Sequence, residues 1–226
     1  MNKVSIVIPV FNREKWVSEA IESALAQTHK KIEVVVVNDG STDKSETEIL
    51  KFKDKVKYIR QGNMGPAVAR NTGIKAATGS FIVPLDSDDK LDPLFIEKLL
   101  PFMGRFDFVS TWVRAFGKID EIWRWGPYDG EKHFKSQVSL AYCALFKKKM
   151  WAKIGGYKVI KTKKGVHGFE DWEFWVSAWK LGFKGYVHPE PLFHYRKHGY
   201  SLYDQAKSNK QELRDLLKYL HPDLYM

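Results

Sequence analysis

The chain has 226 residues, 44% of them hydrophobic, which is enough apolar sequence to bury a large core in one domain or two closely joined lobes. Its one cysteine, Cys143, excludes a disulfide framework and is interpreted as a buried structural thiol. No apolar stretch approaches the ~18 residues that span a bilayer, and the first residues lack the layout of a signal peptide. We therefore expect a cytoplasmic protein, in at most peripheral contact with the inner face of a membrane.

The net charge of +10 is concentrated in the second half of the chain. Residues 1–117 hold 17 Lys and Arg against 15 Asp and Glu, whereas residues 118–226 hold 20 against 12. A basic surface suits an anionic partner such as nucleic acid, phospholipid or a phosphorylated substrate, and it is equally compatible with an ordinary solvated surface. Because the sequence contains no recognised RNA- or DNA-binding motif, we expect no nucleic-acid partner.

Strands and helices are predicted to alternate through the first 102 residues. Asn12 is available to cap the first helix, and Thr42 or Asp43 to cap the second. The expected strands are residues 4–10, 32–37, 56–59 and 80–85, and the expected helices are residues 17–25, a short one that ends near 52, 67–77 and 93–102. This alternation requires parallel strand pairing and right-handed crossovers, as in a nucleotide-binding α/β half.

After residue 102 the pattern becomes mixed. The expected elements are an antiparallel strand pair (106–116 and 119–125), a loop (126–137), a strand (140–146), a short helix (147–154), a basic loop (155–168), a helix (170–181) and two short strands (185–187 and 192–195). Near the end, four leucines at helical spacing predict a helix that docks on the body of the protein: Leu213, Leu216, Leu217 and Leu220.

The stretch 80–89 is the most informative part of the sequence, because an apolar run ends abruptly in Asp86, Asp88 and Asp89. An acidic turn that caps the next helix is one explanation, but Asp92 with the proline after it already reads as that cap. Three adjacent carboxylates repel one another unless a cation or a donor-rich ligand joins them. The sequence therefore favours a metal and nucleotide site here.

Two other expected strands also end in polar residues, at Asn12 and Asp39. Parallel pairing places these ends and the acidic turn at one edge of the sheet, where open α/β folds bind ligands. Several familiar sites are excluded: the sequence lacks the dinucleotide-binding glycine motif, the P-loop and the hydrolase nucleophile elbow. Its His and Cys residues are too scattered for a structural zinc site.

Five segments in order and at family-like spacing carry a resemblance: VSIVIPVFN (4–12), VVVNDGSTD (35–43), GPAVARNTG (65–73), LDSDD (85–89) and GFEDWE (168–173). Together they resemble the GT-A glycosyltransferases of family 2, over roughly residues 2–200. The resemblance implies one GT-A domain whose mostly parallel, Rossmann-like half (about 1–102) binds a nucleotide sugar and whose mixed half (about 103–203) binds the acceptor, followed by a C-terminal helix (about 204–226).

The resemblance also implies a reaction, the inverting transfer of a sugar from a nucleoside-diphosphate sugar to an acceptor hydroxyl by direct displacement. A UDP-sugar is the favoured donor, and a polysaccharide, glycolipid or other glycoconjugate the expected acceptor. Residues 118–168, where the resemblance is thinnest, are expected to select that acceptor. Transfer to a polyprenyl phosphate and nucleotide binding without catalysis remain as alternatives.

The family implies roles for the residues at the strand ends. Asp88 is expected to bind Mn²⁺ or Mg²⁺, with Asp86 facing the ribose or the water shell of the metal. Asp39 is expected to accept hydrogen bonds from the base or ribose, although an Asp-Gly pair also forms turns. The other expected nucleotide contacts are Pro9, Phe11, Asn12, Arg70 and Ser87. For Arg70 the alternative is an ordinary charge on the helix surface.

Inversion requires a base that takes the proton of the attacking hydroxyl. By resemblance this is Asp171, while Glu170 and Trp172 are expected to contact the donor sugar or the acceptor. Both acids also suit the start of a helix, where negative charge is favoured, but one acid suffices for that. Arg196 and His198 are expected near the diphosphate, with His198 a further candidate metal ligand. Trp123 and Trp125 are candidate sugar-stacking residues, and core packing is the better explanation for Trp175.

Overall fold

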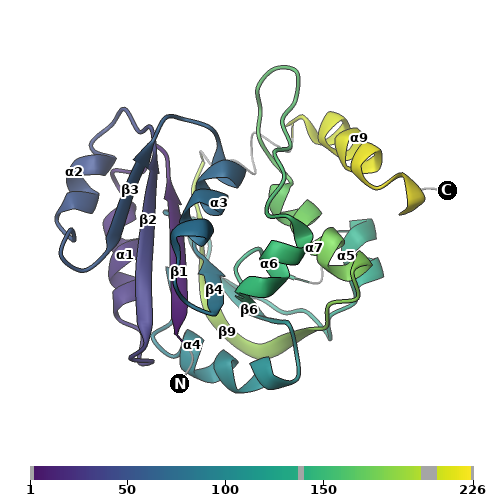
Figure 1. The fold of residues 1–226 in the computed structure, drawn as a ribbon, viewed down its shortest axis with the longest axis horizontal. Helices are drawn as coiled ribbons and strands as arrows, with labels where there is room; N and C mark the ends of the chain where they lie inside the picture. Colours follow the sequence, from purple (N-terminus) through teal and green to yellow (C-terminus); the bar gives the residue numbers. More distant parts are fainter. Residues whose placement is uncertain (1–2, 137–139, 200–207, 225–226) are drawn as a thin grey trace.

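The computed structural model describes residues 3–136, 140–199 and 208–224. The first half forms the predicted parallel strands with helices between them (Figure 1). The strands are β1 (Val4–Val10), β2 (Ile32–Asp39), β3 (Lys57–Gln61) and β4 (Phe81–Pro84), and the helices are α1 (Val17–Leu25), α2 (Ser45–Leu50) and α3 (Pro66–Ala76). β1 lies parallel to β2 and β4, and β2 lies parallel to β3. The predicted α/β half is confirmed.

β1 is buried along its whole length because the sheet is covered on both faces. Ile6 and Ile8 pack on the face that α1 covers, and Val7 packs on the opposite face with α3. Gly73 in α3 lies so close to β1 that an added Cβ would stand 2.3 Å from Val7 Cγ1. This close approach fixes α3 against the sheet, and with it Arg70, which lies one turn earlier on the same helix.

The rest of the chain extends the same sheet. Its strands are β5 (Lys90–Leu91), β6 (Phe108–Gly117), β7 (Glu121–Trp123), β8 (Leu145–Lys147) and β9 (Gly185–Lys197), and its helices are α4 (Phe95–Leu99), η1 (Leu100–Gly104), α5 (Gly130–Ser136), α6 (Lys148–Ile154), α7 (Glu170–Lys180), α9 (Lys210–Leu220) and η2 (Pro222–Leu224). The strand order is β3-β2-β1-β4-β8-β6-β9-β5, with β7 paired to β6 alone. The expected antiparallel pair, β6 and β7, is confirmed.

β9 corrects one prediction, since a single strand of 13 residues replaces two short ones. The segment between the two expected strands contains two prolines, Pro189 and Pro191, which cannot donate to a sheet ladder. In the structure they lie in a bulge: His188 pairs with Thr111, and the next paired residue is Phe193 opposite Val113. The bulge takes up the residues that cannot join the ladder, and the strand continues on either side of it.

Three further elements differ from the predictions. The expected loop at 126–137 contains α5, which starts beside Asp129, whose Oδ1 accepts the Lys132 N–H at 2.9 Å; residue 137 lies outside the described residues. Of the expected strand 140–146, only Leu145 and Phe146 pair, as part of β8 (Leu145–Lys147). β5 was not predicted; it pairs antiparallel with β9, through Lys90 opposite His194, and so holds the acidic turn beside the end of β9.

The predicted capping role of Asn12 is wrong. α1 begins only at Val17, and Asn12 adopts a left-handed backbone conformation, with φ 52°. Its Oδ1 instead accepts the Thr42 N–H at 2.8 Å, which ties the loop after β1 to the loop after β2. Asp43 fits its prediction better, because its Oδ1 accepts the N–H of Ser45 at the start of α2.

The C-terminal helix docks as predicted. Leu213 and Leu217 of α9 are buried against Trp172 and Val176 of α7. The expected boundary of this segment, near residue 204, lies outside the described residues.

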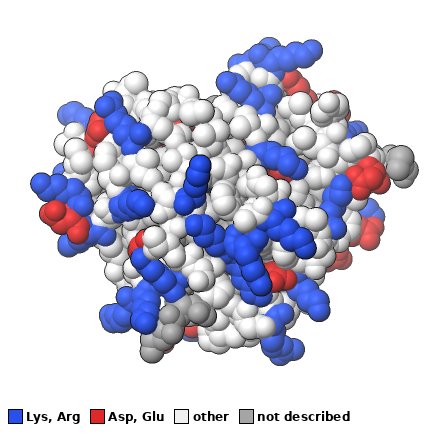
Figure 2. Space-filling view, viewed as in Figure 1, with Lys and Arg blue, Asp and Glu red and all other residues white. Residues whose placement is uncertain are grey.

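Cys143 is buried and free, as expected. Among the described residues, no helix is both long and apolar enough to cross a membrane. Lys and Arg side chains outnumber Asp and Glu on the face shown in Figure 2.

Candidate active site

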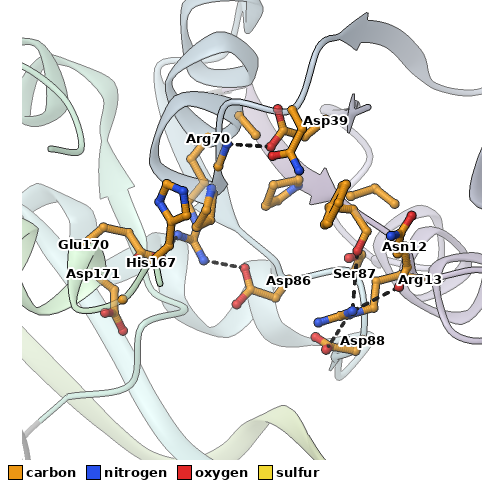
Figure 3. A pocket seen from close by; sticks show the side chains of 18 of the residues that line it. Asn12, Arg13, Asp39, Arg70, Asp86, Ser87, Asp88, His167, Glu170 and Asp171 are labelled. Carbon is orange, nitrogen blue, oxygen red and sulfur yellow. Dashed lines mark hydrogen bonds and ion pairs between the residues drawn. The ribbon is translucent and has the colours of Figure 1, made fainter. Parts of the chain in front are cut away.

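A cavity of about 940 Å³ opens where the carboxyl ends of β1, β2 and β4 face the segment before α7 and the end of β9 (Figure 3). It brings the predicted strand-end residues together, as parallel pairing required. The predicted site residues that line it are Pro9, Phe11, Asn12, Asp39, Arg70, Asp86, Ser87, Asp88, Glu170, Asp171, Arg196 and His198. The position of the cavity thus agrees with the edge of the sheet at which the sequence predicted a site.

Two side chains, those of Arg13 and His198, share one oxygen of Asp88. Its Oδ2 lies 3.0 Å from Arg13 Nε and 3.0 Å from His198 Nε2, and the His198 ring stacks on Trp16 with centroids 4.2 Å apart. Burial alone would raise the pKa of Asp88, but the hydrogen bond from His198 and the charge of Arg13 outweigh it and lower that pKa. Asp88 is therefore held as a carboxylate.

Sequence reasoning missed Arg13. Its signal was its position directly after Asn12, at the end of the first strand, where it shares the cavity edge with the acidic turn. Nη1 also donates to the Asn12 carbonyl at 3.0 Å, so the side chain folds back across the end of β1. Figure 3 shows the guanidinium extended toward Asp88.

Arg70 joins the two halves of the protein. It is only 4% exposed, and its Nη2 donates to Asp86 at 2.6 Å while Nη1 donates to Glu170 at 2.7 Å. Burial lowers the pKa of Arg70, but the charges of both acids raise it well above its ordinary value. The pKa of Asp86 is raised, by burial first and by the neighbouring Asp88 charge, against the lowering effect of Arg70. Arg70 is therefore not a solvated charge on the helix surface, and both terminal nitrogens of its guanidinium already donate to acids of the protein.

Asp171 lies at the start of α7 next to Glu170, but its side chain points in a different direction (Figure 3). The residue before the pair, Phe169, has a left-handed backbone with φ 64°, a conformation that a bulky residue rarely adopts. Burial raises the pKa of Asp171 to about 6, and the charge of Glu170 adds to the effect. A carboxylate with such a pKa is a competent proton acceptor near neutral pH.

Asp39 accepts three hydrogen bonds within the protein. Oδ1 takes the Gln61 Nε2 donor at 2.7 Å and the Met64 N–H at 2.9 Å, and Oδ2 takes the Gly65 N–H at 2.8 Å. The carboxylate therefore organises the turn before α3, which agrees with the turn-forming interpretation. It also lines the cavity, so the interpretation as a ligand contact stands beside it as a prediction.

Arg196 is already engaged within the protein. Its Nη2 donates to Glu19 at 2.9 Å, its Nε donates to the Asp88 carbonyl at 2.7 Å, and its backbone N–H donates to Asp89 Oδ1 at 2.6 Å. Tyr142 completes the arrangement by donating to Asp89 Oδ2 at 2.7 Å. These contacts hold the end of β9 against the acidic turn, and the expected contact of Arg196 with a diphosphate stays a prediction.

Trp172 does not line the cavity, contrary to its predicted contact with a sugar. It is 3% exposed, packs edge-to-face on Phe169, and donates its Nε1 proton to the His133 carbonyl at 3.1 Å. The cause is helical geometry: one residue after Asp171, the side chain points about 100° around α7, toward α9. Trp123 is packed half-buried against the core, and Trp175 is 1% exposed, as core packing predicted for it.

Comparison with known proteins identifies the family. The sequence profile described as "Glycosyl transferase family 2" matches residues 5–169, which is more than half of the chain. This chain belongs to glycosyltransferase family 2. An uncharacterized glycosyltransferase of Rickettsia felis is 48% identical over 121 residues, which are 53% of this chain and 20% of that protein. The glycosyltransferase GlyA of Streptococcus pneumoniae is 39% identical over 101 residues, 43% of this chain and 14% of that protein. The chain thus spans only a minor part of the curated relatives it matches.

Solved structures confirm the GT-A fold of this family 2 member. The S. aureus protein TarS in complex with UDP-GlcNAc aligns with a TM-score of 0.76 at 19% identity, over 96% of this chain and 66% of that one. The mannosyltransferase PcManGT of Pyrobaculum calidifontis, in complex with GDP-Man and Mn²⁺, aligns with a TM-score of 0.68 at 17% identity, over 94% of this chain and 62% of that one.

The residues of this family 2 protein fit a divalent cation that shares its coordination with a ligand. Among the described residues, no group of three or more His, Cys, Asp and Glu side chains could enclose a metal ion. Mg²⁺ is usually bound by one or two carboxylates together with substrate phosphates. Asp88 offers such a carboxylate, with His198 beside it and Asp86 two residues away. Arg13 already contacts Asp88 Oδ2, so a cation bound at that oxygen would compete with its guanidinium.

Gly65 is one of the places where the two halves of the family 2 domain touch. It has φ 88°, and a Cβ built on it would stand 2.4 Å from His167 Cε1. We expect Gly65→Ala to lower the free energy of unfolding by about 2 kcal/mol, from left-handed backbone strain and the displaced imidazole. Gly62→Ala is the matched control, because nothing lies within 4 Å of its Cβ and its φ is not in the left-handed region. Urea unfolding of both variants measures the difference. Equal free energies of unfolding for the two variants would contradict the close contact between Gly65 and His167.

Proposed function

We propose that this protein transfers a sugar from a nucleoside-diphosphate sugar to an acceptor hydroxyl, with inversion at the anomeric carbon. The observation that carries the proposal is the separation of two kinds of acid in one cavity. Asp88, whose pKa is lowered, lies at one wall, and Asp171, whose pKa is raised to about 6, lies at the other (Figure 3). The first suits a divalent cation that also binds the phosphates of a donor, and the second suits proton abstraction.

The first half of the chain, about residues 1–102, is proposed to bind the donor. Phe11 is 41% exposed at the cavity edge and offers a ring on which a base can stack. Pro9, Asn12 and Ser87 surround the same wall, and Asp39 shapes it through the Met64 and Gly65 N–H groups. A UDP-sugar is the favoured donor, because TarS, whose fold is similar, was solved with UDP-GlcNAc.

The leaving diphosphate needs compensation of its growing negative charge. A bound Mn²⁺ or Mg²⁺ supplies this as a Lewis acid, and Asp88, with Asp86 or His198, is proposed to hold it. The Arg13 guanidinium, released from Asp88, is then free to donate to the phosphate oxygens.

Asp171 is proposed as the base. It takes the proton of the acceptor hydroxyl as that oxygen bonds to the anomeric carbon, and the bond between that carbon and the diphosphate oxygen breaks on the opposite side. Glu170 is held by Arg70 through Oε1, so its second oxygen is placed to accept a hydrogen bond from a sugar hydroxyl. Residues from about 103 to 203 thus form the acceptor half of the proposed enzyme.

The assignment of Asp171 predicts a pH dependence. A base acts only when deprotonated, so the rate at saturating donor is expected to rise about tenfold per pH unit below the pKa of about 6 and to level off above it. The acidic limb should vanish in Asp171→Asn, together with most of the rate. Initial rates of nucleotide release between pH 4.5 and 8 measure this dependence. If the rate of the variant still fell at low pH, a group other than Asp171 would be responsible for the pH dependence.

Binding of nucleotides tests the donor half. Calorimetric titrations with UDP, GDP, dTDP and CDP, each with and without Mn²⁺, should give one preferred nucleotide whose affinity rises with the metal. A protein that binds none of the four under either condition would refute the proposed function. A preferred nucleotide other than UDP would change the donor and leave the reaction class in place.

A further inference from the structure

The longest acid-free stretch near the cavity is strongly basic. Residues 132–169 contain ten lysines and no Asp or Glu. Several of these lysines have structural partners, such as Lys147 with Asp107 at 3.0 Å and Lys158 with Glu173 at 2.7 Å. Lys161, Lys163 and Lys164 form no ion pair with any described residue. These three sit together on the segment that rises above the sheet beside α9 (Figure 1).

This segment is an ordered hairpin. Lys161 and His167 pair as an antiparallel bridge, and between them Thr162 N–H donates to the Val166 carbonyl at 2.9 Å. Thr162 is 4% exposed, and its Oγ1 accepts the Val166 N–H at 3.0 Å. The Lys163 N–H donates to Glu212 Oε1 on α9 at 2.7 Å. The hairpin is therefore held from within and from α9, and its lysines project from a fixed frame.

Two of the unpaired lysines, Lys161 and Lys164, line the cavity. The hairpin leads directly into Glu170 and Asp171, and Figure 3 shows His167 on the same side of the cavity as these two acids, away from Asp88 and Arg13. An acceptor hydroxyl must approach this wall if Asp171 takes its proton. The hairpin that carries Lys161 and Lys164 therefore borders the wall that the acceptor hydroxyl must approach.

We propose that the acceptor carries a phosphate group, which Lys161 and Lys164 bind while its hydroxyl meets Asp171. The inference rests on the proposed function and adds the chemical class of the acceptor. Without the hairpin, the acids of the cavity would repel a phosphate; two lysines without counter-charges offset this repulsion, and a lysine ammonium suits a phosphate oxygen as a point charge. The phosphate can belong to a soluble phosphodiester-linked saccharide or polyol, or to the headgroup of a lipid.

The test uses the full chain with saturating UDP and Mn²⁺, so that the donor site is occupied. The probes are a fluorescent glycerol phosphate hexamer, an uncharged glucose hexamer, and vesicles with and without phosphatidylglycerol. Lys161→Gln with Lys164→Gln should weaken binding of the phosphate probe about tenfold at low salt. The matched control is Lys149→Gln with Lys153→Gln, which removes the same charge from exposed positions on α6 that do not line the cavity; it should change binding less than twofold.

The hexamer and the vesicles also show whether the phosphate belongs to a soluble acceptor or to a lipid. Hexamer binding without vesicle binding indicates a soluble acceptor, and loss of vesicle binding in the hairpin variant indicates a lipid-carried one. Wild-type affinity for both phosphate probes in the hairpin variant, or equal losses in both variants, would overturn the inference while UDP binding still supports the proposed function. A hairpin variant that loses UDP affinity would assign the lysines to the donor. A wild-type protein that binds no nucleotide would instead refute the proposed function itself.

Discussion

Asp171→Asn is expected to reduce sugar transfer by about 10²- to 10⁴-fold, the range that general bases contribute, while nucleotide affinity stays within twofold of wild type. The amide keeps the size of the carboxylate and removes only its ability to take a proton. Its Oδ1 can still accept the Trp172 N–H, which now bonds at 2.8 Å, so the start of α7 should keep its shape. Nucleotide-release rates and calorimetry on the same preparation measure both quantities.

Stability provides the control for this variant. The pKa of Asp171 is raised to about 6 in the folded protein, above its ordinary value near 4, so the native state binds the proton more tightly than the unfolded chain does. This contribution to stability is complete below pH 4 and is lost as the pH rises through 6. At pH 7 the neutral Asn variant should therefore be at least as stable as wild type, and its lost rate cannot come from unfolding. A variant with the wild-type rate would remove Asp171 from the mechanism.

Asp88→Asn is expected to abolish the effect of Mn²⁺ on nucleotide affinity. The variant loses the carboxylate proposed as metal ligand, and it also loses the anionic partner of Arg13. The freed guanidinium can still donate to phosphate, so metal-free nucleotide binding should remain. The nucleotide affinities measured with and without Mn²⁺ should then be equal for the variant and should differ about tenfold or more for the wild-type protein.

Arg13→Gln is the informative companion of this variant. It removes the competitor for Asp88 Oδ2 and leaves the carboxylate, so Mn²⁺ should bind at least as tightly as in wild type, as measured by the loss of the free-ion signal in electron paramagnetic resonance. A wild-type Mn²⁺ dependence in Asp88→Asn, or weaker Mn²⁺ binding in Arg13→Gln, would contradict the placement of the metal at Asp88.

Much of the fold followed from local signals in the sequence. Apolar runs such as Val4–Val10 favour strands covered on both faces, and parallel order then brings Asn12, Asp39 and Asp86 to one edge. The position of the cavity was predictable for this reason. The pairing of β9 was not, because a bulge that absorbs two prolines depends on the partner strand and not on the prolines themselves.

The contacts inside the site depend on residues far apart in the chain. Arg70 meets Glu170 across 100 positions, and Arg13 meets Asp88 across 75, so no local pattern could reveal either pair. The motif identified Arg70 as a site residue but could not show that its guanidinium joins the two halves. Trp172 misled for a related reason: its neighbour Asp171 faces the cavity, while the docking of α9 decides that the indole is buried.

The stereochemistry of the product tests the central claim most directly. We would follow the turnover of UDP-N-acetylglucosamine, or of the sugar of whichever nucleotide binds best, by time-resolved ¹H NMR, with the phosphate-bearing and uncharged acceptors offered in parallel. Direct displacement at an α-linked donor must give a product whose new linkage, or first-formed free sugar, is β. An α product would contradict the single displacement assisted by Asp171, and no turnover of any bound nucleotide sugar would contradict the proposed transfer.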